Sequence, residues 1–390
     1  MRITHVITRL IVGGAQENTV ASVLGLRRKP GLEVDLISGP SIGPEGSLET
    51  SVQELSGTVI LLPELVRPIH PLKDWIALRR LTRMFERMRP AVVHTHSGKA
   101  GLLGRLAAER AGVPIIVHTI HGPSFGAFQG AVANWTFRAA ERRAGRVTTH
   151  FVSVVDAMTA QYLAAGIGRP EQFTTIRSGF DLEPYLNAGN DASFRRRWGF
   201  SEDDVIVGKI ARICRLKGHD DLFAAAPRIV ERCPRVRFLL VGDGEWRARF
   251  EERARSEGMA KHFVFAGLVP PAEVPSLVGI MDLLVHLSLR EGLARALPQA
   301  LAAGKPVVAY DCDGAREVCL DNRTGFLLRA GDRAGLVDSV CRLASDSELR
   351  ARMGREGRDL VRAQFGVQQM VDALYELYGR LAAARGLAFP

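Results

Sequence analysis

The sequence predicts an α/β protein with two doubly wound, Rossmann-like domains. Short runs of β-branched and other apolar residues alternate with longer helical segments along the whole chain. Near-continuous apolar runs are typical of parallel strands that helices cover on both faces, and their alternation with helices is typical of doubly wound sheets. The chain has 390 residues, and a domain usually has about 100–200, so two domains are expected.

Strands are predicted in both halves of the chain. In the N-terminal half they lie at 3–10, 33–39, 58–63, 91–97, 114–120 and 149–154, and in the C-terminal half at 205–213, 237–244, 262–267, 283–288 and 306–311. Between them, residues 178–204 are polar and rich in turn formers, so we expect a boundary near residues 180–200. After Gly354 the chain reads as helix towards its end.

Composition excludes several classes of protein. No apolar run reaches the ~18–20 residues that span a bilayer, and His5, Thr8 and Arg9 interrupt the apolar start, so neither a membrane span nor a signal peptide is expected. The five cysteines are odd in number and form no CxxC pair, so neither a disulfide framework nor a zinc site is supported. We therefore expect a cytoplasmic protein.

The charge balance indicates anionic partners. The net charge is +10, which suits nucleotide phosphates, anionic lipid or nucleic acid. In the helical segment 74–90, Arg79, Arg83 and Arg87 are four residues apart, beside an apolar stripe that includes Trp75. Two interpretations stay open, a solvated face or a cationic surface for anionic lipid at the inner face of the membrane. No recognised nucleic-acid-binding module supports the third partner class.

Two loops carry features that suit phosphate binding. Gly13 and Gly14 follow the first strand and open a helix, where glycine allows close backbone approach and a helix N-terminus favours phosphate. The dinucleotide fingerprint GxGxxG is absent there, which disfavours an NAD enzyme. Arg212 and Lys217 follow the strand at 205–213, at the edge where open α/β sheets bind ligands. Two such cations can neutralise a diphosphate without a metal ion.

The most informative segment runs from Glu291 to Gln299. Glu291 follows the strand at 283–288, and Gln299 lies eight residues further on, in a helix predicted to begin near Ala294 or Arg295 because Pro298 is tolerated only in a first turn. At about 1.5 Å rise per residue the two side chains are up to ~12 Å apart. That separation suits two hydroxyl-bearing rings joined by a diphosphate. Glu291 is then predicted to bind sugar hydroxyls, Gln299 the ribose, and the amides near Gly292 and Leu293 the phosphates.

These motifs resemble the family-4 retaining glycosyltransferases of the GT-B fold. The resemblance rests on IARICRLKGH, FLLVGDGEWR, FVFAGLV, SLREGLARALPQALAAGKPVVA and DGAREVCLDNRTGFLL in the second half, and on GGAQ, VVHTHSGKAGLLGRLAAERAGVPIIVHTIHG and FVSVVDAM in the first. It implies an acceptor-binding domain at 1–185 and a nucleotide-sugar-binding domain at 186–365, which face each other across a cleft. A C-terminal helix at 366–390 is expected to return to the first domain.

The resemblance also implies roles for individual residues. Arg212 and Lys217 bind the diphosphate, Glu291 holds the donor sugar, and Gly14 approaches the donor phosphates. His121 lies by the transferred sugar. Val264 and Phe265 border the nucleobase. Catalytic roles thus fall to His121, Arg212, Lys217 and Glu291. One departure is Gln299, which replaces the second glutamate of the family's E-x7-E motif; an amide has one acceptor oxygen where a carboxylate has two, so weaker ribose binding is expected.

No metal site is predicted. Asp311-Cys312-Asp313 spells the DxD motif of the other large glycosyltransferase fold, but it follows a strand within the GT-B-like segment. His94 and His96 share one face of a strand without an acidic third ligand at metal-like spacing, so structural or polar cleft-lining roles are expected for them and for His118.

The predicted activity is transfer of a sugar, with retention, from a nucleotide-diphosphate sugar to a hydroxyl of a glycan, glycolipid or other acceptor. No cofactor is expected. The alternatives are a sugar-nucleotide epimerase of the same fold, which needs no acceptor, and a protein that binds sugar nucleotides or lipid surfaces without turnover, which Gln299 keeps open.

Overall fold

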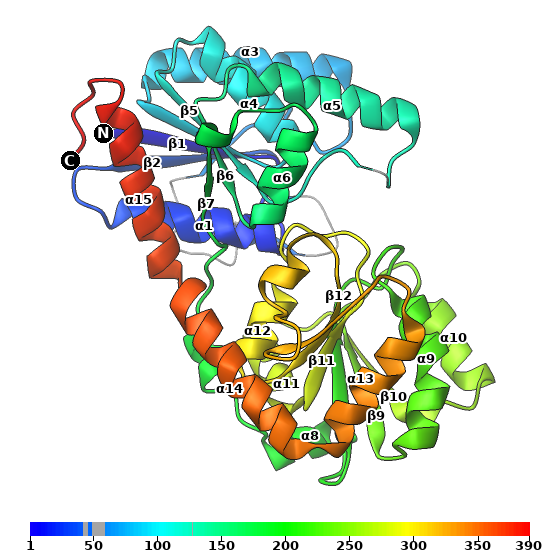
Figure 1. The fold of residues 1–390 in the computed structure, drawn as a ribbon. Helices are drawn as coiled ribbons and strands as arrows, with labels where there is room; N and C mark the ends of the chain where they lie inside the picture. Colours follow the sequence, from blue (N-terminus) through cyan, green and yellow to red (C-terminus); the bar gives the residue numbers. More distant parts are fainter. Residues whose placement is uncertain (42–45, 49–58, 127) are drawn as a thin grey trace. The chain divides into compact units, whose positions relative to one another are not determined.

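The chain forms two compact α/β units, each built around a parallel sheet (Figure 1). The computed structural model describes residues 1–41, 46–48, 59–126 and 128–390. The first unit comprises Met1–Phe180 together with Val367–Pro390, and the second comprises Asp181–Gly366. Within the described residues, none of the helices has both the length and the hydropathy needed to cross a bilayer.

The first unit contains a sheet of seven strands in the order β3-β2-β1-β4-β5-β6-β7. All neighbouring strands pair in parallel. Its strands are β1 (Arg2–Ile7), β2 (Glu33–Ser38), β3 (Val59–Leu61), β4 (Val92–His96), β5 (Ile115–Ile120), β6 (His150–Ser153) and β7 (Phe173–Thr175). Its helices are α1 (Gly14–Arg27), α3 (Pro71–Met88), α4 (Gly98–Arg110), α5 (Ala131–Gly145), α6 (Asp156–Ala164) and α15 (Val367–Ala383), with a short 3-10 turn at Pro170–Gln172.

The last helix belongs to the first unit, as predicted. Helix α15 packs against α1, and Met370, Leu374 and Tyr378 join the core on that face of the sheet. Lys29, just after α1, forms an ion pair with Asp372 of α15 at 2.5 Å. Helix α14 (Ser347–Gln364) stays in the second unit, and α15 begins at Val367, after Gly366.

The second unit contains a sheet of six strands in the order β10-β9-β8-β11-β12-β13. Neighbouring strands again pair in parallel. The strands are β8 (Val205–Ile210), β9 (Val236–Val241), β10 (Phe263–Gly267), β11 (Leu283–His286), β12 (Val307–Tyr310) and β13 (Gly325–Leu328). The helices are α7 (Glu183–Leu186), α8 (Ala192–Arg197), α9 (His219–Arg232), α10 (Arg247–Ser256), α11 (Val274–Ile280), α12 (Ala296–Ala302), α13 (Arg333–Ser345) and α14, with 3-10 turns at Ala260–His262, Pro271–Glu273 and Asp313–Glu317.

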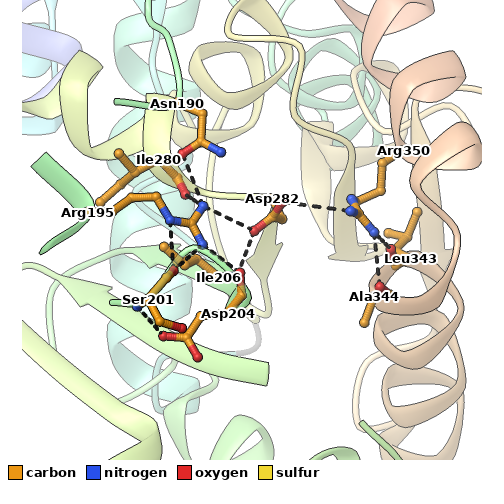
Figure 2. Close-up of polar contacts among 10 residues, drawn as sticks. All are labelled: Asn190, Arg195, Ser201, Asp204, Ile206, Ile280, Asp282, Leu343, Ala344 and Arg350. Atoms are coloured by element: carbon orange, nitrogen blue, oxygen red, sulfur yellow. Dashed lines mark hydrogen bonds and ion pairs between the residues drawn. The ribbon is translucent and has the colours of Figure 1, made fainter. Parts of the chain in front are cut away.

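A buried arginine ties α8 to the starts of β8 and β11 (Figure 2). Arg195 is 4% exposed, and its guanidinium donates to the carbonyl oxygens of Ser201, Asp204 and Ile280. Asp282 lies 3.9 Å from the guanidinium and accepts from the amide of Ile206 at 2.8 Å. This network fixes the amino ends of the two central strands, so their carboxyl ends are held in register at the opposite edge of the sheet.

The predicted strands all form, and the differences lie at the margins. Strand β3 begins at Val59, and Thr58 of the predicted segment lies outside the described residues. Strands β7 and β13 were not predicted because each has only three or four residues at the edge of a sheet. The prediction that Trp75 belongs to the apolar stripe of α3 was wrong. Ala77, Leu81 and Phe85 are buried, but Trp75 is 51% exposed, with the Arg79 guanidinium 4.3 Å from its ring.

Candidate active site

The strand order of the second unit reverses between β8 and β11. The chain passes from β8 to β9 and β10 on one side, then returns to β11 on the other side of β8. The loops that follow β8 and β11 therefore leave the same edge of the sheet side by side. Ligands of open α/β sheets bind at such a switch point. The predicted residues Arg212, Lys217 and Glu291 all lie on these two loops.

The two loops are locked together by backbone contacts. The amide of Leu289 donates to the carbonyl oxygen of Leu216 at 2.8 Å. Gly218, which caps α9, has a φ of 68°, in the left-handed region. A Cβ at this position would lie 2.0 Å from the carbonyl oxygen of Leu287. Only glycine therefore fits there, and this close approach brings Lys217 towards the loop after β11.

Lys217 and Glu291 form an ion pair across the two loops. Both side chains are partly buried. Burial alone would raise the pKa of Glu291, but Lys217, His286 and Ser288 outweigh burial and hold this pKa below its ordinary value. Glu291 is therefore a carboxylate at neutral pH, able to accept from hydroxyl groups. Its backbone amide donates to Asp313 at 2.7 Å, which fixes the loop.

The remaining predicted residues of this unit lie around the ion pair at differing depths. Arg212 is exposed at the start of the loop after β8. Gly292 accepts at its carbonyl oxygen from the amide of Gly314 at 3.2 Å, and Leu293 is half-buried. Helix α12 begins at Ala296, slightly later than predicted, and has only seven residues. A helix this short adds little dipole of its own at the loop.

Gln299 and the predicted base-binding residues lie further along the edge. Gln299 is half-buried in α12, and its side-chain amide makes no hydrogen bond with any of the residues described. Val264 and Phe265 lie in β10, the edge strand, two strands away from β8. Both are half-buried, and Phe265 packs against the core.

The DxD motif is used for structure in this unit. Asp313 accepts from the amide of Glu291 at 2.7 Å and from the thiol of Cys312 at 3.4 Å. Asp311 forms an ion pair with Arg316. Among the described residues, the motif's carboxylates belong to no cluster with the spacing of a metal site.

Sequence reasoning missed a buried cation beneath the ion pair. Lys209 lies in β8, is 1% exposed, and its ammonium nitrogen has no hydrogen-bond partner among the described residues. Burial, and to a lesser degree the charge of Lys217, lowers the pKa of Lys209 to about 7. His286 lies 3.7 Å from Glu291, and burial lowers its pKa to about 4. A lysine inside the apolar run VIVGKI was the available signal for this group.

Replacing Lys209 by methionine is expected to stabilise the protein, most strongly at low pH. The unfolded lysine has a pKa near 10.4, whereas the folded one has a pKa of about 7. Below pH 7 the buried lysine is charged and the whole penalty is present; as the pH rises towards 10 it deprotonates in the folded state and the penalty fades. Thermal melts of Lys209→Met and wild type should differ by about 4 kcal/mol at pH 6, at about 1.4 kcal/mol for each pKa unit of the shift, and by less than about 1 kcal/mol at pH 10. An equal difference at both pH values would contradict this account.

The first unit brings its predicted residues to the carboxyl edge of its own sheet. Gly13 caps α1 with an extended backbone, so its φ does not itself require glycine; Gly14 is the first residue of that helix. His121 follows β5, and its Nε2 lies 3.1 Å from Nδ1 of His96 at the end of β4. His118 faces the other way and contacts Thr95 at 2.9 Å.

Both units match known glycosyltransferase families. Residues 13–179 match the family described as glycosyl transferase 4-like domain, and residues 190–360 match the family described as glycosyl transferases group 1. A GDP-mannose-dependent alpha-(1-6)-phosphatidylinositol monomannoside mannosyltransferase of Mycolicibacterium smegmatis is 31% identical over 265 residues, which cover 66% of this chain and 68% of that protein. The chain belongs to the glycosyl transferases group 1 family.

Further relatives agree over nearly the full length. A UDP-Gal:alpha-D-GlcNAc-diphosphoundecaprenol alpha-1,3-galactosyltransferase of Escherichia coli is 25% identical, covering 97% of this chain and 96% of that protein. The crystal structure of Anabaena Alr3699/HepE in complex with UDP-glucose shares the fold, with a TM-score of 0.82 at 22% identity over 97% of this chain and 100% of that one.

The glycosyltransferase is a retaining hexosyltransferase of the GT-B fold that uses a nucleotide-diphosphate sugar in polysaccharide or glycolipid biosynthesis. The predictions of fold class, family and activity are thereby confirmed. This activity replaces the two alternatives considered from the sequence, a sugar-nucleotide epimerase and a binding protein without turnover.

Proposed function

We propose that the loops after β8 and β11 bind the donor diphosphate and the donor sugar. Lys217 and Arg212 neutralise the phosphates, and Glu291 accepts from hydroxyls of the transferred sugar. Gln299 binds the ribose, and the amides of Gly292 and Leu293 add phosphate contacts. The observation that carries this proposal is the Lys217–Glu291 ion pair at the switch point of the second sheet.

The ion pair fits a site that exchanges partners when the donor binds. In the free protein each charge neutralises the other. A diphosphate competes for the Lys217 ammonium, and sugar hydroxyls then replace it on the Glu291 carboxylate. Cations aimed at the leaving phosphate stabilise the charge that develops as the glycosidic bond breaks. The phosphate can itself take the proton of the attacking hydroxyl, which requires no protein base. In the first unit, Gly14 approaches the donor phosphates and His121 binds a hydroxyl of the transferred sugar.

We further propose that donor binding needs no divalent metal and that the base is uracil. The full-length relative named above uses UDP-Gal, and the structural neighbour contains UDP-glucose; the mannosyltransferase relative uses GDP-mannose, so guanine is the competing base. Val264 and Phe265 then border the base. Arg212 and Lys217 supply the positive charge that a metal would otherwise bring.

A thermal-shift screen against UDP, GDP, ADP and TDP tests the donor site. UDP at 100 times its dissociation constant is expected to stabilise the protein by about 2.7 kcal/mol, with or without EDTA. A shift with GDP alone would overturn the choice of base and keep the site. A shift that disappears in EDTA would overturn metal independence, and no shift with any diphosphate would overturn the donor site itself.

For the acceptor, we propose a lipid-linked saccharide reached at an anionic membrane surface. Two relatives carry lipid-linked acceptors in their names, a diphosphoundecaprenol and a phosphatidylinositol mannoside. In the first unit, Ile69, Leu72 and Trp75 are exposed at the start of α3. Arg79, Arg83 and Arg87 are exposed further along the same helix. Apolar anchors beside basic residues are the pattern of helices that lie at membrane interfaces.

Vesicle sedimentation tests this surface. The protein is expected to bind phosphatidylglycerol vesicles at low salt and to be released by high salt, because each basic residue near an anionic surface contributes about 1 kcal/mol. Substituting Arg79, Arg83 and Arg87 by glutamine should abolish binding. The same substitutions at Arg249, Arg253 and Arg255 of α10 serve as the control and should not. Equal loss in both variants would show only net-charge attraction, and no binding at low salt would remove the membrane proposal.

A further inference from the structure

Six buried or partly buried side chains of the first unit form one continuous hydrogen-bonded chain. They come from strands β1, β4 and β5, from the loop after β5, and from helix α15, which packs on the sheet. In the order in which the hydrogen bonds join them, they are Thr119, His94, Tyr378, His5, His96 and His121. His5 and His96 are 2.9 Å apart at Nδ1 and Nε2. The chain therefore ends on the histidine that the proposed function assigns to the sugar.

The imidazoles of this chain are neutral at physiological pH. Burial lowers the pKa of His5 to about 3 and of His121 to about 4. Burial, reinforced by the neighbouring histidines, also holds the pKa values of His94 and His96 well below their usual range. A neutral imidazole has one donor nitrogen and one acceptor nitrogen. Each ring that donates to one neighbour must therefore accept from the other, and the protons of the whole chain are ordered together.

Tyr378 is buried, and a buried hydroxyl proton needs an acceptor, so Tyr378 donates to one imidazole and accepts from the other. Two proton arrangements meet this condition and satisfy every contact, and they run in opposite directions. In the first, the Tyr378 hydroxyl donates to His94, which donates to Thr119; His5 then donates to Tyr378, His96 to His5, and His121 to His96. In the second, every donor and acceptor is exchanged. The Tyr378 oxygen lies 2.5 Å from Nδ1 of His94 and 3.5 Å from Nε2 of His5, and the shorter contact suits the hydroxyl as donor to His94.

We propose that this chain sets the tautomer of His121, with Tyr378, His5 and His96 as positioning residues. In the favoured arrangement His121 carries its proton on Nε2, which donates to His96. Its Nδ1 makes no hydrogen bond with any described residue and presents a lone pair. His121 thus accepts a hydrogen bond from a sugar hydroxyl rather than donating one. This inference rests on the proposed role of His121 towards the sugar.

Three of these histidines are clustered as metal ligands often are, but hydrogen bonds account for their arrangement without a metal ion. Ring nitrogens of His5, His94 and His96 lie within 4.8 Å of one another. Both nitrogens of His94 contact hydroxyl groups, and both nitrogens of His96 contact other imidazoles. The sequence has no acidic third ligand at metal-like spacing from His94 and His96; in the structure their neighbour is His5 of β1, a histidine rather than a carboxylate.

Thr119→Val is the sharpest test, because it removes a hydroxyl five hydrogen bonds away from His121. His94 then has no acceptor at Nε2, so its proton moves to Nδ1 and the whole chain reverses. Nitrogen-15 spectra of protein labelled at histidine distinguish the two tautomers directly. We expect His121 to be protonated on Nε2 in the wild type and on Nδ1 in Thr119→Val. Tyr378→Phe should leave His121 a mixture of both, whereas Tyr375→Phe on the same helix, whose hydroxyl contacts Pro390, should match the wild type.

Three results would contradict control of the His121 tautomer by this hydrogen-bonded chain. They are Nδ1 protonation of His121 in the wild type, an unchanged His121 tautomer in both Thr119→Val and Tyr378→Phe, and stoichiometric zinc bound to these rings, measured by elemental analysis. Failure of the proposed function looks different. If His121 changes tautomer in Thr119→Val and the affinity ratio of UDP-sugar to UDP stays the same, the chain stands and the sugar-binding role of His121 falls. A tenfold or larger fall in that ratio supports both.

Discussion

Lys217→Ala is expected to lower kcat for sugar transfer by about 10²–10³-fold, the usual loss when one preorganised group that stabilises developing charge is removed. Lys217 is held at the switch point by the close approach of Gly218 to the loop after β11. Its charge is the one that already faces Glu291 in the free protein. Without it, the leaving diphosphate loses a fixed cation, and Glu291 loses the partner that keeps its pKa low.

Arg215→Ala is the matched control for Lys217→Ala. Arg215 is an exposed cation on the same loop, and the proposed site gives it no role. Initial rates with saturating donor, together with a circular-dichroism melt of each variant, separate a catalytic defect from a folding defect. Equal losses in both variants would mean that the loop contributes only general positive charge. A Lys217→Ala enzyme with near-normal kcat would contradict its assignment as a leaving-group contact.

Arg195→Met is expected to destabilise the protein by about 3–5 kcal/mol, the cost of breaking a buried charged network by removing one member. The guanidinium is the common donor to three carbonyl oxygens at the amino ends of β8 and β11 (Figure 2). Methionine fills much of the volume but leaves those oxygens without this donor, and Asp282 loses one of its two neighbouring guanidinium groups, keeping Arg350 at 3.8 Å. In a domain of this size the melting temperature falls by about 2–4 °C per kcal/mol.

The neighbouring Arg196 supplies the control. Its side chain is 62% exposed and forms a 3.5 Å ion pair with Glu202, an interaction that contributes about 0–1 kcal/mol. Arg196→Met should therefore leave the melting temperature nearly unchanged. A similar small shift for both variants, measured by calorimetry at pH 7, would show that the Arg195 network does not hold the second sheet together.

The sequence predicts the sheets well because parallel strands leave a strong local signal. Segments such as 114–120 are apolar on both faces and can be recognised without any knowledge of their neighbours. Short edge strands such as β7 and β13 lack that signal, since all three residues of β7 and two of the four residues of β13 are only partly buried.

The candidate site shows the same division between local and tertiary information. Glu291, Lys217 and Arg212 can be assigned to loops because each follows a recognisable strand. Their pairing depends on β8 and β11 being neighbours, which topology alone decides. Lys209 could have been noticed as a charge in an apolar run. The link from His121 to Tyr378 could not, because it joins residues from distant parts of the chain through contacts that no sequence period encodes.

A crystal structure of the complex with UDP, grown in the presence of Mg²⁺, tests the central claim most directly. We expect Lys217 to leave Glu291. Its ammonium and the Arg212 guanidinium should lie within about 3 Å of phosphate oxygens, with the ribose beside Gln299 and no ion between protein and diphosphate. A diphosphate held elsewhere, or bound through Mg²⁺ on Asp311 and Asp313, would contradict it.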